Sequence, residues 1–331
     1  MLQPIYKKMN SSNFILLCAF SFLIACSGNP KNTNDYSEYH LEVIEIENFI
    51  SDNKFEKALD AYEKLFGSHA FIFQRDYKIA AQLALYLDKN ERAIAYIKKG
   101  IACGWELRHV RENNLLAKML TKEDWKNLEK EYDQYRSQYL SRIDTTIRNK
   151  VESMFNLDQN LARQASLIED ENEQEEFFVN QFAAHSNDQL QNLITIINNS
   201  TYPGERLIGN DFWVSTILSH HNSISSEFIR NDALYEYLRP ALFSALNKGY
   251  ISPYELALIE DWKKAVASGW EESVYGYLVA PSPENISMIN NSRQKLGLRT
   301  ITLRNKLVDI EQATGMRLYL PDWVEGKIIV K

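Results

Sequence analysis

Two adjacent histidines, His220 and His221, form the densest pair of imidazoles in this sequence and are its clearest candidates for chemistry. An imidazole can bind a metal ion or exchange a proton near neutral pH, and carboxylates such as Asp158 and Asp261 can complete either kind of site. Neighbouring side chains on a helix point about 100° apart, so one ion cannot take both histidines without distortion. The sequence therefore indicates a candidate polar site around His220, Asp158 and Asp261.

Two enzymatic interpretations and one structural interpretation of His220 stay open at this point. The enzymatic ones are metal binding, with Asp158, Asp261 or His185 as further ligands, and acid–base hydrolysis. In the structural one, His220 packs behind Trp213, and both protonated histidines stabilise the negative end of their helix. No H-E-x-x-H, Cys-x-x-Cys, G-x-S-x-G, P-loop or Rossmann pattern occurs, so we assign no metal ligands and expect no cofactor.

The first 26 residues have the order of features that is typical of an exported, lipid-anchored protein. Lys7 and Lys8 precede an apolar run at 14–25, which is too short for a comfortable membrane span, and the run ends in Leu23-Ile24-Ala25-Cys26. This ending resembles the bacterial lipobox, whose cysteine is lipidated. We therefore predict a signal peptide at 1–25, lipidated Cys26 with a tether at 26–37, and a place in the bacterial cell envelope, at the outer membrane facing the periplasm.

Composition limits the classes of partner. The 331-residue chain is 45% hydrophobic, which suffices for one large or two medium domains, and its net charge of −7 argues against nucleic acid as a partner. It contains three cysteines. Cys18 lies in the leader and Cys26 is the predicted lipidation site, which leaves Cys103 without a partner for an intramolecular disulfide.

The elements that must position these residues are helices throughout. In residues 38–140, two amphipathic pairs carry Ala58 and Ala93 at matching places, at nearly the roughly 34-residue period of tetratricopeptide repeats. Two such units are fewer than the three that a free-standing solenoid needs, so we expect them to pack against later parts of the chain. We predict an all-α fold, with tetratricopeptide-like helical hairpins at 38–140 and then an irregular multi-helix domain at 143–320.

Within the second region, local signals define several helices and one irregular segment. Gly209-Asn210 offers an N-cap to an apolar helix that ends at the histidine pair, and Ser252 with Glu255 forms a capping box. Pro240 predicts a kink or break in its helix. Residues 269–281 are predicted to be extended, and the boundary between the two regions is predicted at 137–145.

Several short motifs of the second region occur in an order that resembles a family of bacterial proteins, many of them lipoproteins, with a domain of unknown function. They are Asp158-Gln159, Pro203-Gly204, Ile208-Gly209, Leu218-Ser219-His220, Asp261, Tyr275-Gly276, Arg293 and Gly297-Leu298. The resemblance covers about residues 143–312, implies a mostly helical fold and brings no established activity. It adds Gln159 and Tyr275 to the candidate polar site.

The function predicted from these observations is interaction. A lipid-anchored envelope protein with helical repeats is expected to bind a protein or peptide partner through an open groove on residues 38–140. One alternative is an envelope hydrolase or metal-binding enzyme with its site around His220, Asp158 and Asp261. The other is a degenerate member of the family that has only a structural role.

Overall fold

A computed structural model describes residues 35–320 and 326–331 of the chain, which form helices and no strands. The predicted all-α fold is confirmed, whereas the predicted signal peptide, Cys26 and tether residues 26–34 lie outside the described residues. Within those residues, no helix combines the length and apolarity needed to cross a membrane. The elements are α1 (Ser37–Ser51), α2 (Phe55–Ser68), α3 (Gln74–Tyr86), α4 (Asn90–Ala102), α5 (Leu107–Arg111), α6 (Asn114–Met119), α7 (Lys122–Arg142), α8 (Thr145–Ser166), α9 (Glu171–Phe177), the π-helical turn η1 (Phe178–Phe182), α10 (Ala183–Asn199), α11 (Glu205–Ile208), α12 (Trp213–His221), α13 (Ser226–Arg230), α14 (Ala233–Asn247), α15 (Pro253–Ala267), α16 (Ile286–Leu296) and α17 (Ile301–Thr314).

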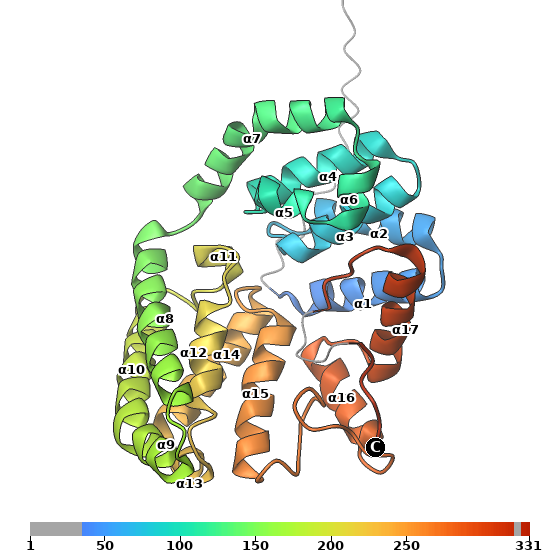
Figure 1. Ribbon diagram of the computed structural model, residues 1–331. Coiled ribbons are helices and arrows are strands. Elements are labelled where there is room, and N and C mark those ends of the chain that lie inside the picture. Colours follow the sequence, from blue (N-terminus) through green and yellow to red (C-terminus); the bar gives the residue numbers. More distant parts are fainter. Residues whose placement is uncertain (1–34, 321–325) are drawn as a thin grey trace, which may run out of the picture.

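The chain follows a closed circuit (Figure 1). Helices α1–α6 form a first block, α7 leads away from it to α8, and α8–α15 form a second block. The chain then returns, and α17 packs against α1. The first and last helices of the described chain are therefore neighbours, which closes the circuit.

The first block contains two helical hairpins, α1–α2 and α3–α4, whose turns are equivalent. Asn53 and Asp88 both adopt the left-handed conformation in these turns, with φ of 59° and 57°. Ala58 and Ala93, at matching places on α2 and α4, are fully buried. Small side chains let neighbouring helices approach closely, so the repeat seen in the sequence has a structural counterpart. The identification of these hairpins as tetratricopeptide-like stays a prediction.

The last helix completes the core of the first block. Leu303, Leu307 and Ile310 of α17 are buried in the same apolar cluster as the side chains of α1–α4. The hairpins thus pack against later residues, as their low number led us to expect. The consequence for domain organisation is that the predicted second region, 143–320, contributes to both cores.

Helix α7 joins the two blocks, and the chain turns sharply after it. Helix α7 ends at Arg142 and α8 begins at Thr145, inside the predicted boundary 137–145. The segment 205–212 lies against α7, because Gly209, at a φ of +97°, lets the Tyr139 side chain approach where any Cβ would collide with its hydroxyl. This contact holds α11 and the start of α12 beside the first block.

The second block is built around α12, which packs against α8, α10 and α15. Ile217 and Leu218 on this helix are buried, as their helical spacing predicts. One detail differs from the sequence-based expectation: α12 begins at Trp213 rather than after Asn210. Of the kink or break predicted at Pro240, the break does not occur, because α14 continues through this residue. Residues 269–281 form bends, with no strand.

A buried ion network ties the ends of the circuit together. The Glu47 carboxylate of α1, 1% exposed, lies 2.7 Å from Arg75 Nη2 on α3 and 3.1 Å from Nε of Arg299, which precedes α17. The guanidinium of Arg299 in turn lies 4.7 Å from the ring centre of Tyr254, in the first turn of α15. One carboxylate therefore connects α1, α3 and the segment that begins α17.

Replacing Glu47 with glutamine should destabilise the protein strongly. The substitution leaves the buried guanidinium of Arg299 without its anion and Arg75 with Asp76 alone, and breaking a buried pair in this way costs about 3–5 kcal/mol. Chemical unfolding monitored by circular dichroism measures the loss. The control is Glu56→Gln, which removes an exposed partner of Lys89 and should change little. Equal stability of the two variants would show that the network does not hold the circuit closed.

Candidate functional site

The structure brings three of the five predicted polar-site residues together. His220 Nδ1 lies 2.6 Å from Asp158 Oδ2, and Gln159 Nε2 donates to the same oxygen at 3.2 Å. The Asp158 side chain is 1% exposed and the His220 side chain 29% exposed. The pair therefore joins a buried carboxylate on α8 to a partly accessible imidazole at the end of α12.

The other two predicted residues, Asp261 and Tyr275, belong to a different cluster. Asp261 accepts hydrogen bonds from Ser273 Oγ and from the backbone N–H groups of Val274, Tyr275 and Tyr277, at 2.7–2.9 Å. Burial raises the pKa of this carboxyl, and the four hydrogen bonds oppose that shift. Both oxygens of Asp261 are thus used to hold the irregular segment after α15, which gives this residue a structural role.

The second histidine of the pair takes part in a buried hydrogen-bonded chain that sequence reasoning missed. His221 Nδ1 lies 2.7 Å from Ser186 Oγ, and His221 Nε2 lies 2.8 Å from Asp232 Oδ2. The three side-chain types are those of a hydrolase triad, but His221 is fully buried and Ser186 is 2% exposed. Asp232 also caps α14 through the N–H groups of Leu234 and Tyr235. The chain of contacts therefore satisfies buried polar groups. Among residues 35–320 and 326–331, no group of three or more His, Cys, Asp or Glu side chains is placed to hold a metal ion.

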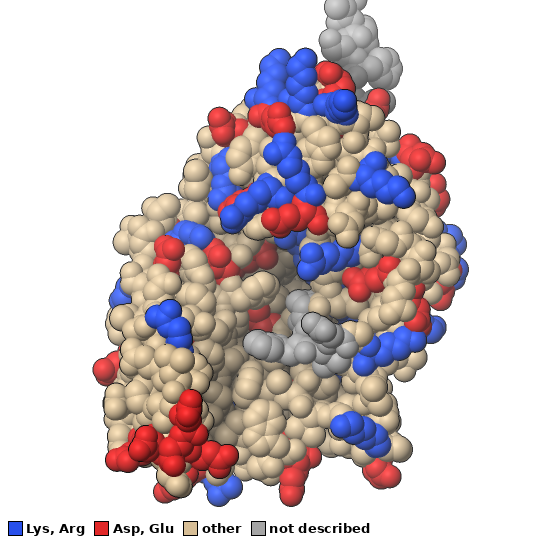
Figure 2. All heavy atoms as spheres, in the orientation of Figure 1, with Lys and Arg blue, Asp and Glu red and all other residues tan. Residues whose placement is uncertain are grey.

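A cavity lies elsewhere, where the two blocks and the returning chain meet. Its volume is about 510 Å³. Figure 2 shows the face of the molecule hollowed in this central region, with side chains of both charges around the hollow. The wall is formed by α1 and α3, by segment 205–212, by the start of α15, and by α17 with the residues after it. A cavity of this size falls within the range of about 300–1,000 Å³ that is typical of small-ligand sites.

Two carboxyl groups in this cavity have pKa values near neutrality. Burial raises the pKa of Asp76 to about 6, although Arg75 and a hydrogen bond from the Tyr39 hydroxyl oppose the shift. Burial likewise raises the pKa of Glu205 to about 7, opposed by Lys78 and by the Gln74 N–H, which donates to Glu205 Oε1 at 2.6 Å. Clusters of such displaced pKa values in a concavity are typical of functional sites.

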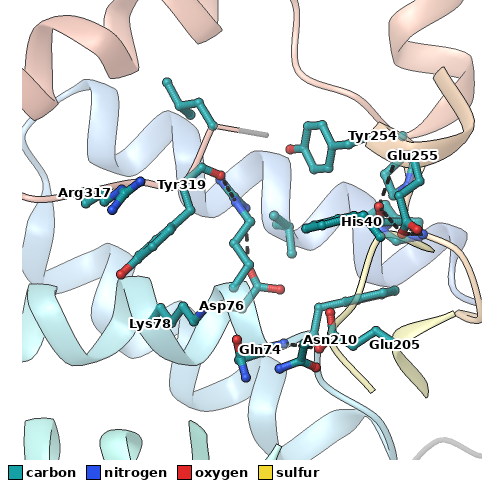
Figure 3. Close-up of a pocket in the computed structure, with 18 of the residues that line it drawn as sticks. His40, Gln74, Asp76, Lys78, Glu205, Asn210, Tyr254, Glu255, Arg317 and Tyr319 are labelled. Atoms are coloured by element: carbon teal, nitrogen blue, oxygen red, sulfur yellow. Dashed lines mark hydrogen bonds and ion pairs between the residues drawn. The ribbon is translucent and has the colours of Figure 1, made fainter. Parts of the chain in front are cut away.

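Two cations, Lys78 and Arg317, lie across the cavity from Glu205 (Figure 3). Lys78 Nζ is 5.1 Å from the ring centre of Tyr319, and the guanidinium carbon of Arg317 is 5.3 Å from the same centre. Burial lowers the pKa of Lys78 to about 8, with Arg317 lowering it further and Glu205 raising it. Figure 3 shows Lys78 and Arg317 beside Tyr319, with His40, Glu205 and Glu255 across the cavity.

The comparisons with known proteins add nothing to this geometry. No protein-family model, no curated protein and no solved structure matches the chain. The resemblance of residues 143–312 to an uncharacterised lipoprotein family stays a prediction. We therefore take the central cavity, with its charged and aromatic wall, as the candidate functional site.

The raised pKa of Glu205 predicts a pH-dependent effect of Glu205→Gln on stability. A carboxyl whose pKa rises from 4.5 to about 7 on folding contributes stability below pH 4.5, and this contribution is lost as the pH rises through 7. Glutamine keeps an acceptor for the Gln74 N–H and carries no charge. We expect the variant to melt about 2–4 °C above the native protein at pH 8, with a smaller difference at pH 5.

Thermal unfolding at the two pH values tests this expectation, with the exposed Glu227→Gln on α13 as the matched control. A difference that does not grow from pH 5 to pH 8, or that appears equally in the control, would contradict the assigned environment of Glu205.

Proposed function

We propose that this protein is a lipid-anchored component of the bacterial cell envelope that binds a peptide segment of a partner in its central cavity. The anchor is the lipidated sulfur of Cys26, and the tether carries the folded part into the periplasm from the outer membrane. The observation that carries the binding proposal is the 510 Å³ cavity between the two blocks, whose wall combines aromatic rings with charged groups.

The shape of the wall supports a peptide-sized occupant. One side is formed by α1 and α3, within the region 38–140 where we expected a groove, and the other by segment 205–212 and the start of α15. Phe212 contributes to the wall and remains 61% exposed. A large, exposed aromatic ring beside charged groups is the kind of anchor that carries much of the binding energy in protein–peptide complexes.

The alternative hydrolase or metal site has less support. It requires His220, Asp158 and Asp261 to act together, and the oxygens of Asp261 instead accept four hydrogen bonds from residues 273–277. The contact of His220 with Asp158 has a structural explanation, because a buried carboxylate needs a hydrogen-bond donor. We therefore propose binding rather than catalysis.

Crosslinking in native envelopes tests the binding proposal. Phe212→Ala should reduce the yield of the crosslinked partner at least about fivefold, because truncating an aromatic anchor costs more than ~1 kcal/mol. Tyr237→Ala on α14 is the matched control: its ring is 64% exposed and lies outside the cavity wall, so capture should be unchanged.

Two outcomes would count against the proposal. Equal loss of capture in both aromatic variants would place the partner outside the cavity. A Cys26→Ala variant that stays in the membrane fraction would show that lipidated Cys26 is not the membrane anchor.

A further inference from the structure

The cations Lys78 and Arg317 have no ion-pair partner among residues 35–320 and 326–331. Neither Lys78 Nζ nor the Arg317 guanidinium forms an ion pair with another described residue, and both cations lie against aromatic rings. Two other charged groups of the wall differ in this respect: Arg75 pairs with Glu47, and Asp211 pairs with Arg148. The ring of Tyr319 lies between the two cations (Figure 3), and together they create a local positive field around it.

Buried amides hold this cation pair in place. The side chain of Gln82, one helical turn after Lys78 on α3, donates to the Arg317 carbonyl at 2.8 Å and accepts from the Arg317 N–H at 2.8 Å. Asn113 Nδ2 donates to Gln82 Oε1 at 3.0 Å and to the Tyr319 hydroxyl at 3.2 Å. Gln82 is fully buried and Asn113 is 3% exposed.

These amides therefore fix the segment after α17 against α3 without using the charged ends of Lys78 or Arg317. Arg317 is itself an exposed residue, so its guanidinium stays accessible while its backbone is held. Groups whose supports are locked by a second layer of hydrogen bonds are preorganised for a ligand.

The geometry points to a carboxylate subsite: we propose that the peptide that occupies the cavity places a carboxylate beside Tyr319, in the positive field of Lys78 and Arg317. This inference rests on the proposed peptide-binding function and names the chemistry that the peptide must carry. The carboxylate comes either from an acidic side chain or from a free C-terminus, because both present the same two oxygens. An ammonium that is short of water and lacks an anion gains most from such a group.

Three pools of tetrapeptides separate these sources. In the first pool both termini are blocked and each peptide contains one glutamate. In the second, glutamine replaces that glutamate, so the peptides have no carboxylate. The third pool contains the glutamine peptides with a free C-terminus. Calorimetric titration of the full mature chain should show at least one carboxylate pool binding about tenfold more tightly than the neutral pool.

Substitutions in the chain assign that preference to the cation pair. Lys78→Met keeps the length of the side chain over the rings of Trp105 and Tyr319, and Arg317→Met leaves the backbone contacts to Gln82 intact. Each should abolish most of the tenfold preference, while Lys64→Met, an exposed lysine on α2, should retain it. Melting curves establish that each variant is folded.

Each remaining result has a defined meaning. If the neutral pool binds as tightly as the carboxylate pools, the proposed function stands and the carboxylate subsite is wrong. If the preference survives both methionine substitutions, the carboxylate binds elsewhere and the inference fails. If no pool binds, the carboxylate subsite is overturned, and the crosslinking comparison of Phe212→Ala with Tyr237→Ala decides the proposed function separately.

Discussion

The buried carboxylate of Glu47 is the interaction on which the rest of the structure depends. It neutralises Arg75 and Arg299, which come from helix α3 and from the segment before α17. A single anion shared by two enclosed guanidinium groups is costly to lose, so the network favours the one arrangement in which the chain ends meet. The apolar side chains of α17 then complete the core of the first block.

Closure of the circuit has a functional consequence, because the cavity exists only where both blocks and the returning chain meet. Its carboxyls come from α3, α11, α15, α17 and the segment before α12, and the cations Lys78 and Arg317 come from α3 and the segment after α17. No single block contains this set. The same closure that stabilises the fold thus gathers positive and negative groups around one cavity, which suits a polar ligand (Figure 3).

Local features of the sequence predicted much of the fold, because helix caps act over a few residues. The capping box at Ser252 forms as expected. The contact of His220 with Asp158 also agrees with the predicted candidate site. Asp261 could not be assigned correctly, since its partners are mostly backbone N–H groups that have no side-chain signature. Glu205 was missed for another reason: its environment depends on α3, more than a hundred residues earlier, and on burial that only the closed circuit creates.

The most direct test of the account is a crystal structure of the full mature chain with the tightest-binding acidic peptide. The account predicts that the peptide lies in the central cavity, with a carboxylate oxygen within hydrogen-bond distance of Lys78 Nζ or of the Arg317 guanidinium. It also predicts that the ion network around Glu47 is unchanged. A peptide bound on an outer face, or beside His220 and Asp158 with the central cavity empty, would contradict it.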